Sequence, residues 1–248
     1  EALSEEEVAE LKAQVGDFIT VPPSTAEDSL TMAIDVIASR EFDIVLIDSF
    51  GSLLTEHDVE NDFSASQRVG GAAMLNTRFS RKLNNALAPD KAGNPNLTSV
   101  IGINQVRDNT DRANKYSPKT IEAGGWALKH ARWVTVEMSP QGFIYGEKRK
   151  KLGKNIRWEI TKQKAGGHEG AQGAYEFYFD DVGIRRAEHA AKIAGMYDIV
   201  QKSGAWYSFG GERIGQGAQK AAKYILENDL LAEIEEQTLE AAGIRCSY

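Results

Sequence analysis

The stretch FDIVLIDSFGSL, residues 42–53, contains an unbroken apolar run that ends in one aspartate, Asp48, followed by Ser49. A run without polar alternation is typical of a strand buried on both faces of a parallel sheet. One interpretation is that the strand simply stops and Asp48 caps the following turn. The other is chemical, with Asp48 at the carboxyl edge of the sheet, facing the magnesium of a bound nucleotide.

A second apolar run, LTSVIGINQ at 97–105, also reads as a buried strand and also ends in a polar residue, Gln105. A helical pattern near 70–87 lies between the two runs. Right-handed crossovers place the ends of parallel strands at one edge of the sheet, which is where ligands bind. We therefore expect Asp48 and Gln105 to lie together, which favours the chemical interpretation.

The rest of the chain alternates between helical spacing and strand patterns. Helices are expected at about 5–14, 30–40 and 70–87, and strands at 17–21, 42–48, 97–105, 131–139, 155–164 and 173–180. The last three strands alternate in polarity and are expected to be antiparallel, whereas 106–123 is polar and aperiodic. The sequence thus predicts an α/β fold with a mostly parallel central sheet plus antiparallel strands. The expected domains are a core at 1–185 and a small α-rich C-terminal domain at 186–248.

Composition and charge narrow the functional class. The 248 residues carry a net charge of −7, which excludes a uniformly basic nucleic-acid coat but leaves room for a local patch. No apolar run approaches the roughly 18 residues of a membrane helix, and no leader pattern is seen, so no membrane partner is expected. Cys246 is the one cysteine, which suits the cytoplasm. The histidines lack metal-ligand spacing, so no zinc site is expected.

Two groups of cations suggest contacts with anions. Lys162 and Lys164 alternate at a strand end in ITKQKAGG, so both point to one face, where they would suit a polyphosphate or simply solvent. The basic stretch EKRKKLGKNIR, 147–157, is interpreted as a solvated hairpin turn, with nucleic-acid contact as the alternative. The sequence contains no G-x-x-x-x-G-K-[ST] phosphate loop. A magnesium-binding strand without that loop indicates either a degenerate ATPase or a chain that lacks its front end.

Four motifs, in this order, resemble those of the bacterial recombinase RecA family. They are GINQVR (102–107), GGWALKHA (124–131), ITKQKAGG (160–167) and GAWYSFGGERIGQG (204–217). The similarity runs from Glu1 to about Leu239. It implies a RecA-type ATPase core that uses ATP and Mg²⁺, and a DNA-dependent ATPase in the full-length protein. It also implies helical self-assembly on single-stranded DNA and strand exchange with homologous double-stranded DNA.

The resemblance assigns nucleotide roles to individual residues. Asp48 would hold Mg²⁺ through water, and Gln105 would sense the γ-phosphate at the root of a second DNA-binding loop, 106–123. Lys162 and Lys164 would reach ATP bound to the neighbouring subunit. On the same implied grounds, Ser49 and Lys129 would lie on this ATP-binding seam, and Glu1 aligns approximately with the glutamate that orients the attacking water.

The resemblance also implies a DNA surface. A first DNA-binding loop corresponds to 56–69, and the implied DNA contacts are Val69, Arg81, Arg107, Gly124 and Gly125. Met74 stands where the family has another arginine, and His130 stands where it has an interface phenylalanine. The family's phosphate loop and docking helix would precede Glu1.

Two other classes stay open. A RecA-fold helicase motor shares both strands, although the motif at 204–217 belongs to recombinases. A non-hydrolysing accessory paralogue that binds DNA is favoured only if Glu1 is the true start of the protein.

Overall fold

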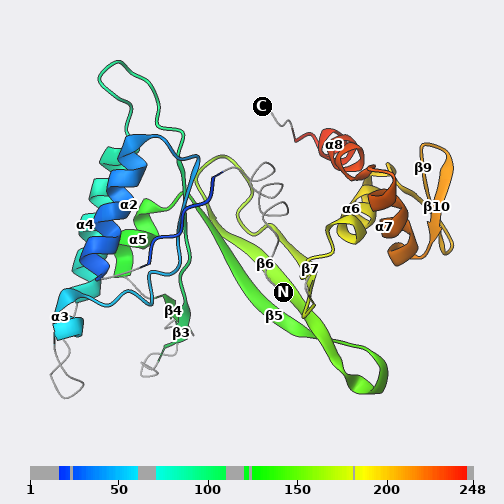
Figure 1. Cartoon of the computed structure of the whole chain (residues 1–248), viewed down its shortest axis with the longest axis horizontal. Coiled ribbons are helices and arrows are strands. Elements are labelled where there is room, and N and C mark those ends of the chain that lie inside the picture. Colours follow the sequence, from blue (N-terminus) through cyan, green and yellow to red (C-terminus); the bar gives the residue numbers. More distant parts are fainter. Residues whose placement is uncertain are drawn as a thin grey trace. The chain divides into compact units, whose positions relative to one another are not determined.

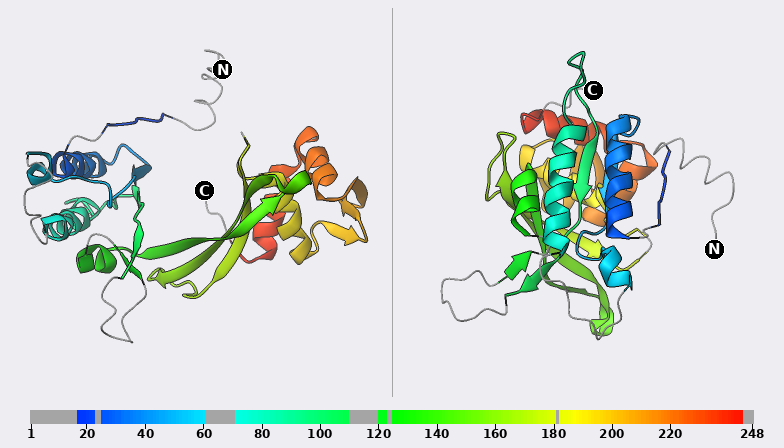
Figure 2. Two further views of the ribbon diagram at one scale, coloured as in Figure 1. Left: turned by 90° about the horizontal axis from the view of Figure 1, so that it is seen from below. Right: turned by 90° about the vertical axis from the view of Figure 1, so that its left-hand side faces the viewer.

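The computed structural model describes residues 17–22, 25–60, 71–109, 120–122, 125–180 and 182–244. The chain divides into two compact units, Glu1–Arg132 and Trp133–Tyr248, which are described separately (Figures 1 and 2). The helix expected at 5–14 lies outside the described residues. The domain boundary expected at 185 stays a prediction.

The first unit contains the expected parallel pair of strands. β1 (Ile44–Ile47) pairs with β2 (Ser99–Gly102) in parallel, with Leu46 beside Ile101. Helices α2 (Ala26–Ser39) and α4 (Gly71–Ala86) pack against each other in this unit (Figure 1). The parallel pairing predicted from the two apolar runs is therefore confirmed.

Helix α2 begins four residues earlier than the apolar spacing indicated, because Thr25 caps it. The Thr25 Oγ1 accepts a hydrogen bond from the Asp28 backbone N–H at 3.2 Å, and Glu27 and Asp28 place negative charge in the first turn. The helix ends where Arg40 adopts a left-handed conformation, φ +64°.

The expectation that β1 is buried on both faces is wrong for the described residues. Ile44, Leu46 and Ile101 are 60%, 53% and 50% exposed. Alternate residues share a face, and the register puts Leu46 beside Ile101, so these three side chains form one open face. Val45, Ile47 and Val100, on the other face, are half-buried, and the Phe50 ring lies against Gly102 on that side. We call the exposed side, formed by Ile44, Leu46 and Ile101, the open face.

Two further expectations for this unit need correction. The run 17–21 forms no strand, and Phe18 is 82% exposed, because no described strand pairs with it. Conversely, the ends of the aperiodic segment 106–123 do form strands, β3 (Val106–Asp108) and β4 (Thr120–Glu122), which pair with each other in antiparallel fashion. The unit also contains the short helices α3 (Glu56–Glu60) and α5 (Gly125–Ala131).

The second unit begins with an antiparallel sheet of three strands, in the order β5-β6-β7. These are β5 (Val134–Tyr145), β6 (Lys151–Gln163) and β7 (Gln172–Tyr178), with the short turn η1 (Glu147–Arg149) between the first two. The antiparallel arrangement expected for these segments is confirmed.

The C-terminal part is rich in helices, as predicted, and has its own core. Its elements are α6 (Arg186–Ala194), η2 (Gly195–Tyr197), β8 (Gln201–Ser203), β9 (Trp206–Phe209), β10 (Glu212–Gln216), α7 (Ala218–Glu227) and α8 (Leu231–Ala241). Val200, Ile225 and Ile234 are almost completely buried, and alanines of α6 and α7 let these two helices approach closely. The stretch expected as a glycine-rich turn forms the β9–β10 pair instead.

In the described part of the chain, every helix is too short or too polar to cross a bilayer.

Candidate functional site

The ends of β1 and β2 place Asp48 next to the segment that carries Gln105. Parallel pairing continues beyond both strands, because the Ile103 N–H donates to the Ile47 carbonyl at 2.9 Å. After β1 the chain turns back toward the end of β2, where the Phe50 N–H donates to the Ile103 carbonyl at 3.0 Å. Asp48 and Gln105 are both exposed. The two polar strand ends therefore lie at one edge of the sheet, as the crossover rule predicted.

A compact serine turn holds the backbone after Asp48. The Ser52 hydroxyl donates to the Ser49 carbonyl at 2.9 Å and accepts from the Ser49 hydroxyl at 3.2 Å. Ser49 is buried, and the Asp48–Ser49 peptide bond is cis. The ATP-facing role expected for Ser49 stays a prediction, since its hydroxyl donates within its own chain.

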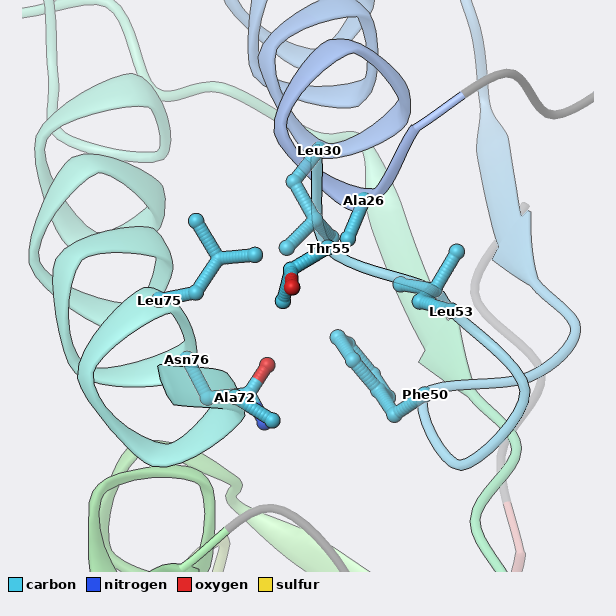
Figure 3. A pocket seen from close by; sticks show the side chains of 8 residues that line it. All are labelled: Ala26, Leu30, Phe50, Leu53, Thr55, Ala72, Leu75 and Asn76. Atoms are coloured by element: carbon cyan, nitrogen blue, oxygen red, sulfur yellow. The ribbon is translucent and has the colours of Figure 1, made fainter. Parts of the chain in front are cut away.

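The segment after this turn is anchored over a small hollow between α2 and α4 (Figure 3). The hollow is mostly apolar, and its lining residues are Ala26, Leu30, Phe50, Leu53, Thr55, Ala72, Leu75 and Asn76. Thr55 and Asp58 then start α3 with reciprocal bonds, in which the Thr55 hydroxyl donates to the Asp58 carboxylate at 2.7 Å. These hydrogen bonds from Thr55 lower the pKa of Asp58. With so few polar groups, the hollow suits packing rather than phosphate binding.

Gln105 connects the sheet edge to the β3–β4 pair. Its backbone N–H donates to the Asn104 Oδ1 at 2.9 Å, and β3 begins at the next residue, Val106. Arg107 lies within β3 opposite Ile121 and is exposed. Gln105 therefore lies between the sheet edge and the first strand of the 106–123 segment.

An ion pair that sequence reasoning missed fixes the other end of this segment. The Arg132 guanidinium binds both carboxylate oxygens of Glu122, at 2.8 and 2.6 Å, and so ties β4 to the end of α5. Bidentate pairs of this kind fix orientation as well as distance. The partners are ten positions apart in the sequence, so no local pattern indicates the contact.

Helix α5 carries an exposed group of aromatic and basic side chains. Trp126 is 73% exposed, the Lys129 Nζ lies 5.2 Å from its ring centroid, and the His130 ring stacks on it at 6.0 Å. Trp126 was not singled out from the sequence. The available signal was a tryptophan directly after three small residues, at 123–125.

Gly125 has a packing reason to be glycine. Its φ is +78°, and a Cβ placed there would lie 3.1 Å from the Ala73 Cβ in α4. The close approach of α5 to α4 thus explains why position 125 is a glycine, and no DNA contact is needed for that explanation. The phosphate contact expected for Gly125 stays a prediction.

Lys162 and Lys164 belong to the second unit. Lys162 lies opposite Thr135 near the end of β6 and is half-buried, while Lys164 follows the strand and is exposed. The Lys164 N–H donates to the Trp133 carbonyl at 2.9 Å, which extends the ladder by one residue. Neither side chain is buried in the core of its own unit, and the contact with a neighbouring subunit expected for both stays a prediction.

Two sequence models of protein families match the chain. One describes the RecA N-terminal domain and matches residues 1–171, and the other describes the RecA C-terminal domain and matches residues 192–243. The chain belongs to the RecA family. The resemblance noted for the motif at 204–217 is thereby confirmed.

Curated RecA proteins from several bacteria are similar over nearly the whole chain. The RecA protein of Oleidesulfovibrio alaskensis is 31% identical over 239 residues, which cover 95% of this chain and 64% of the relative. That of Leptospira meyeri is 30% identical over 237 residues, covering 95% and 58%, and that of Bacillus pumilus is 32% identical over 245, covering 94% and 64%. The chain therefore spans about three fifths of the length of these relatives.

The structure gives positions for only some of the residues to which the RecA resemblance assigns roles. Glu1, Val69 and Gly124 lie outside the described residues. Arg81 is exposed on α4, two helical turns after Met74, which is 67% exposed. Residues seven apart share a helix face. Met74 thus occupies the face of α4 on which a RecA arginine was expected.

The donor set fits the metal side of a RecA nucleotide site. In the described residues, no three His, Cys, Asp or Glu side chains lie close enough to hold a metal on their own. Mg²⁺ is usually held by one or two carboxylates together with phosphates and waters, so exposed Asp48 alone is sufficient on the protein side. Asp48 thus fits the metal side of a magnesium nucleotide, whereas these 248 residues contain no phosphate-loop motif that would hold its phosphates.

Proposed function

We propose that the full-length protein is an ATP-dependent homologous-recombination protein. It forms filaments on single-stranded DNA, pairs them with a homologous duplex and catalyses strand exchange. Membership of the RecA family and the order of the motifs support this assignment. The expected compartment is the cytoplasm. Because base pairing reads the sequence, the protein needs only backbone contacts, which agrees with a net charge of −7 and confined basic regions.

The position of Gln105 is the observation that carries the proposal. Gln105 follows β2 at the sheet edge where Asp48 also lies, and it directly precedes β3. A group at the nucleotide edge is thus one residue away from the segment expected to contact DNA. This short connection gives a physical route by which nucleotide state could alter DNA affinity.

The nucleotide roles follow from the same placement. ATP with Mg²⁺ supplies the transferable γ-phosphate, whose charge must be neutralised in phosphoryl transfer. Asp48 would hold the metal through water, and Lys162 and Lys164 of the neighbouring subunit would face the phosphates. Ser49, Lys129 and Glu1 complete the proposed seam, with Glu1 orienting the water.

The DNA roles are assigned to the two loop regions. Arg107 and Arg81 are exposed cations that would contact phosphates, and Val69, Gly124 and Gly125 would line the same path. Sequence-independent phosphate contacts of this kind suit a protein that binds any strand.

The two alternatives are separated by different observations. A helicase motor is disfavoured because the RecA C-terminal domain matches residues 192–243. An accessory paralogue would bind DNA without hydrolysing ATP, so the absence of DNA-stimulated turnover in the full-length protein would favour it.

The test is the Gln105→Ala variant of the full-length protein, with DNA affinity measured in ATP and in ADP. Without the amide, the nucleotide edge and β3 are uncoupled, so the two affinities should become equal. Gln201→Ala, an exposed glutamine on β8, is the matched control and should keep the parental difference. If ATP still shifts the affinity of Gln105→Ala, Gln105 has a structural role only.

A further inference from the structure

The β3–β4 pair is a weak element by itself. Each strand has three residues, all of these residues are exposed, and among the described residues the two strands pack mainly on each other. An isolated ribbon of two strands is only marginally stable in water, because it buries little apolar surface. The pair therefore needs a contact with another element to hold a fixed position.

Helix α5 can supply that fixed position. It packs on α4, where a Cβ at Gly125 would lie only 3.1 Å from the Ala73 Cβ (Figure 1). Its last turn continues into Arg132, whose backbone N–H donates to the Leu128 carbonyl at 3.2 Å. The Arg132 guanidinium thus extends from a helix that is anchored on α4.

The Glu122–Arg132 ion pair connects the weak element to the anchored one. Two guanidinium nitrogens bind the two carboxylate oxygens, and this geometry fixes the orientation of β4 as well as its distance from α5. Glu122 lies opposite Val106 in the register of the ribbon, and Val106 directly follows Gln105. The ion pair therefore holds the strand position that faces the first residue after Gln105.

The exposure of this ion pair separates positioning from stability. The side chains of Arg132 and Glu122 are 24% and 36% exposed, and exposed pairs change an equilibrium constant by only about two- to fivefold. The Arg132 Nε is buried and has no hydrogen-bond partner among the described residues, so the contacts with Glu122 are what orient the guanidinium. Loss of the pair should thus release β4 without unfolding the protein.

We propose that Glu122 and Arg132 are positioning residues for DNA binding, which brace the β3–β4 pair on α5. With the brace, a change at Gln105 reaches Arg107 in β3, because the ribbon is held at its other strand and cannot bend. Without the brace, the marginal ribbon yields, and Arg107 has the same range of positions in every nucleotide state. The inference rests on the proposed function for the roles of Gln105 and Arg107, whereas the brace itself requires neither nucleotide nor DNA.

The central test is a double-mutant cycle in the full-length protein, with Glu122→Gln, Arg132→Gln and both substitutions together. The measured quantity is the ratio of the DNA dissociation constants in ADP and in ATP. Each single variant should lower this ratio by about two- to fivefold. The double variant should lose no more than either single one, because all three lack the same interaction. Arg132→Lys keeps the charge but not the planar fork, so it should behave like Arg132→Gln.

Hydrogen exchange of the β3 and β4 amides, measured without nucleotide or DNA, tests the brace directly. In Glu122→Gln these amides should exchange about two- to fivefold faster, while those of α5 keep their parental protection because α4 still holds the helix. Glu235→Gln is the matched control, since Glu235 also binds an arginine, Arg186, through both carboxylate oxygens, but in the C-terminal part. It should leave the exchange rates and the affinity ratio unchanged.

Three results would overturn the proposal. They are unchanged β3 and β4 exchange in Glu122→Gln, losses in the single variants that add up in the double variant, and a parental affinity ratio in Arg132→Lys. The proposed function fails in a different way, if the parent itself binds DNA equally in ATP and in ADP. The exchange measurement contains neither ligand, so it decides whether the brace exists in either case.

Discussion

His189 shows how a single side chain can make this fold sensitive to pH. Its Nε2 accepts a hydrogen bond from the Glu176 backbone N–H at 3.2 Å, joining α6 to β7. Burial lowers the pKa of His189, and the nearby Lys192 lowers it further, whereas Glu176 and Glu188 oppose the shift. An acceptor nitrogen must be unprotonated, so the bond exists only in the neutral form.

The sign of the pH effect follows from this depressed pKa. Between the folded pKa and the unfolded value of about 6.5, the unfolded chain binds more protons, so stability rises with pH. We expect the free energy of unfolding, from urea titrations, to fall as the pH is lowered from 7.5 through 6. His189→Gln keeps an acceptor without a titrating group, so it should flatten this dependence. An equally steep fall in His189→Gln would assign the effect to other groups.

The polar residues at the sheet edge illustrate what single positions reveal in a sequence. Asp48 and Gln105 were predicted to lie together because parallel strands end at one edge, and the backbone bonds from Ile103 and Phe50 bring their segments together. The Glu122–Arg132 pair could not be predicted in this way. It joins two short elements whose approach depends on tertiary packing, for which no sequence period exists.

The length of a helix or strand decided whether the sequence could predict it. Helix α4 and the strands β5 to β7 are long enough for their period to be seen in the sequence. β3 and β4 have three residues each, and they form because they pair with each other across a long segment. The run 17–21 has strand composition but no described partner, so its propensity was not sufficient.

Strand β10 makes a sharp prediction for the C-terminal part. The register of β10 shifts between Arg213 and Gly215, and Gly215 there meets the backbone of α7. A Cβ at Gly215 would lie 2.6 Å from the Ala221 backbone N, which cannot move without disturbing the helix. Gly215→Ala should therefore destabilise the protein by about 1–3 kcal/mol, as overpacking does. Thermal unfolding followed by circular dichroism measures the loss.

Gly204→Ala is the matched control for this clash. Gly204 also has a positive φ, +59°, but a Cβ there would meet nothing within 4 Å. Its substitution should cost only the conformational penalty, about 1 kcal/mol. Equal losses in the two variants would show that backbone conformation, rather than contact with α7, makes Gly215 necessary.

For the complete assembly, the proposed nucleotide roles are divided between the two units. Asp48 and Gln105 belong to the first unit, whereas Lys162 and Lys164 belong to the second. If the lysines act on a neighbouring subunit, two inactive full-length variants, Asp48→Asn and Lys162→Ala, should complement each other when mixed. In a randomly mixed head-to-tail filament, about a quarter of the interfaces combine an intact Asp48 with an intact Lys162.

DNA-stimulated ATP turnover of the equimolar mixture measures this complementation. We expect each variant alone to be inactive and the mixture to recover about a quarter of the parental rate. The double variant Asp48→Asn with Lys162→Ala, mixed with the parent, controls for simple dilution. A mixture as inactive as its components would place all these groups within one subunit.

The open face formed by Ile44, Leu46 and Ile101 also bears on how the isolated 248-residue chain behaves as its concentration rises. Large exposed apolar surfaces are sites of association, and two copies that meet through this face shield it from water. Encounters between copies increase with the square of concentration, while folding of each copy does not depend on concentration at all. At high concentration, association through the open face would therefore compete with folding of the isolated chain, and dilution would favour the folded monomer.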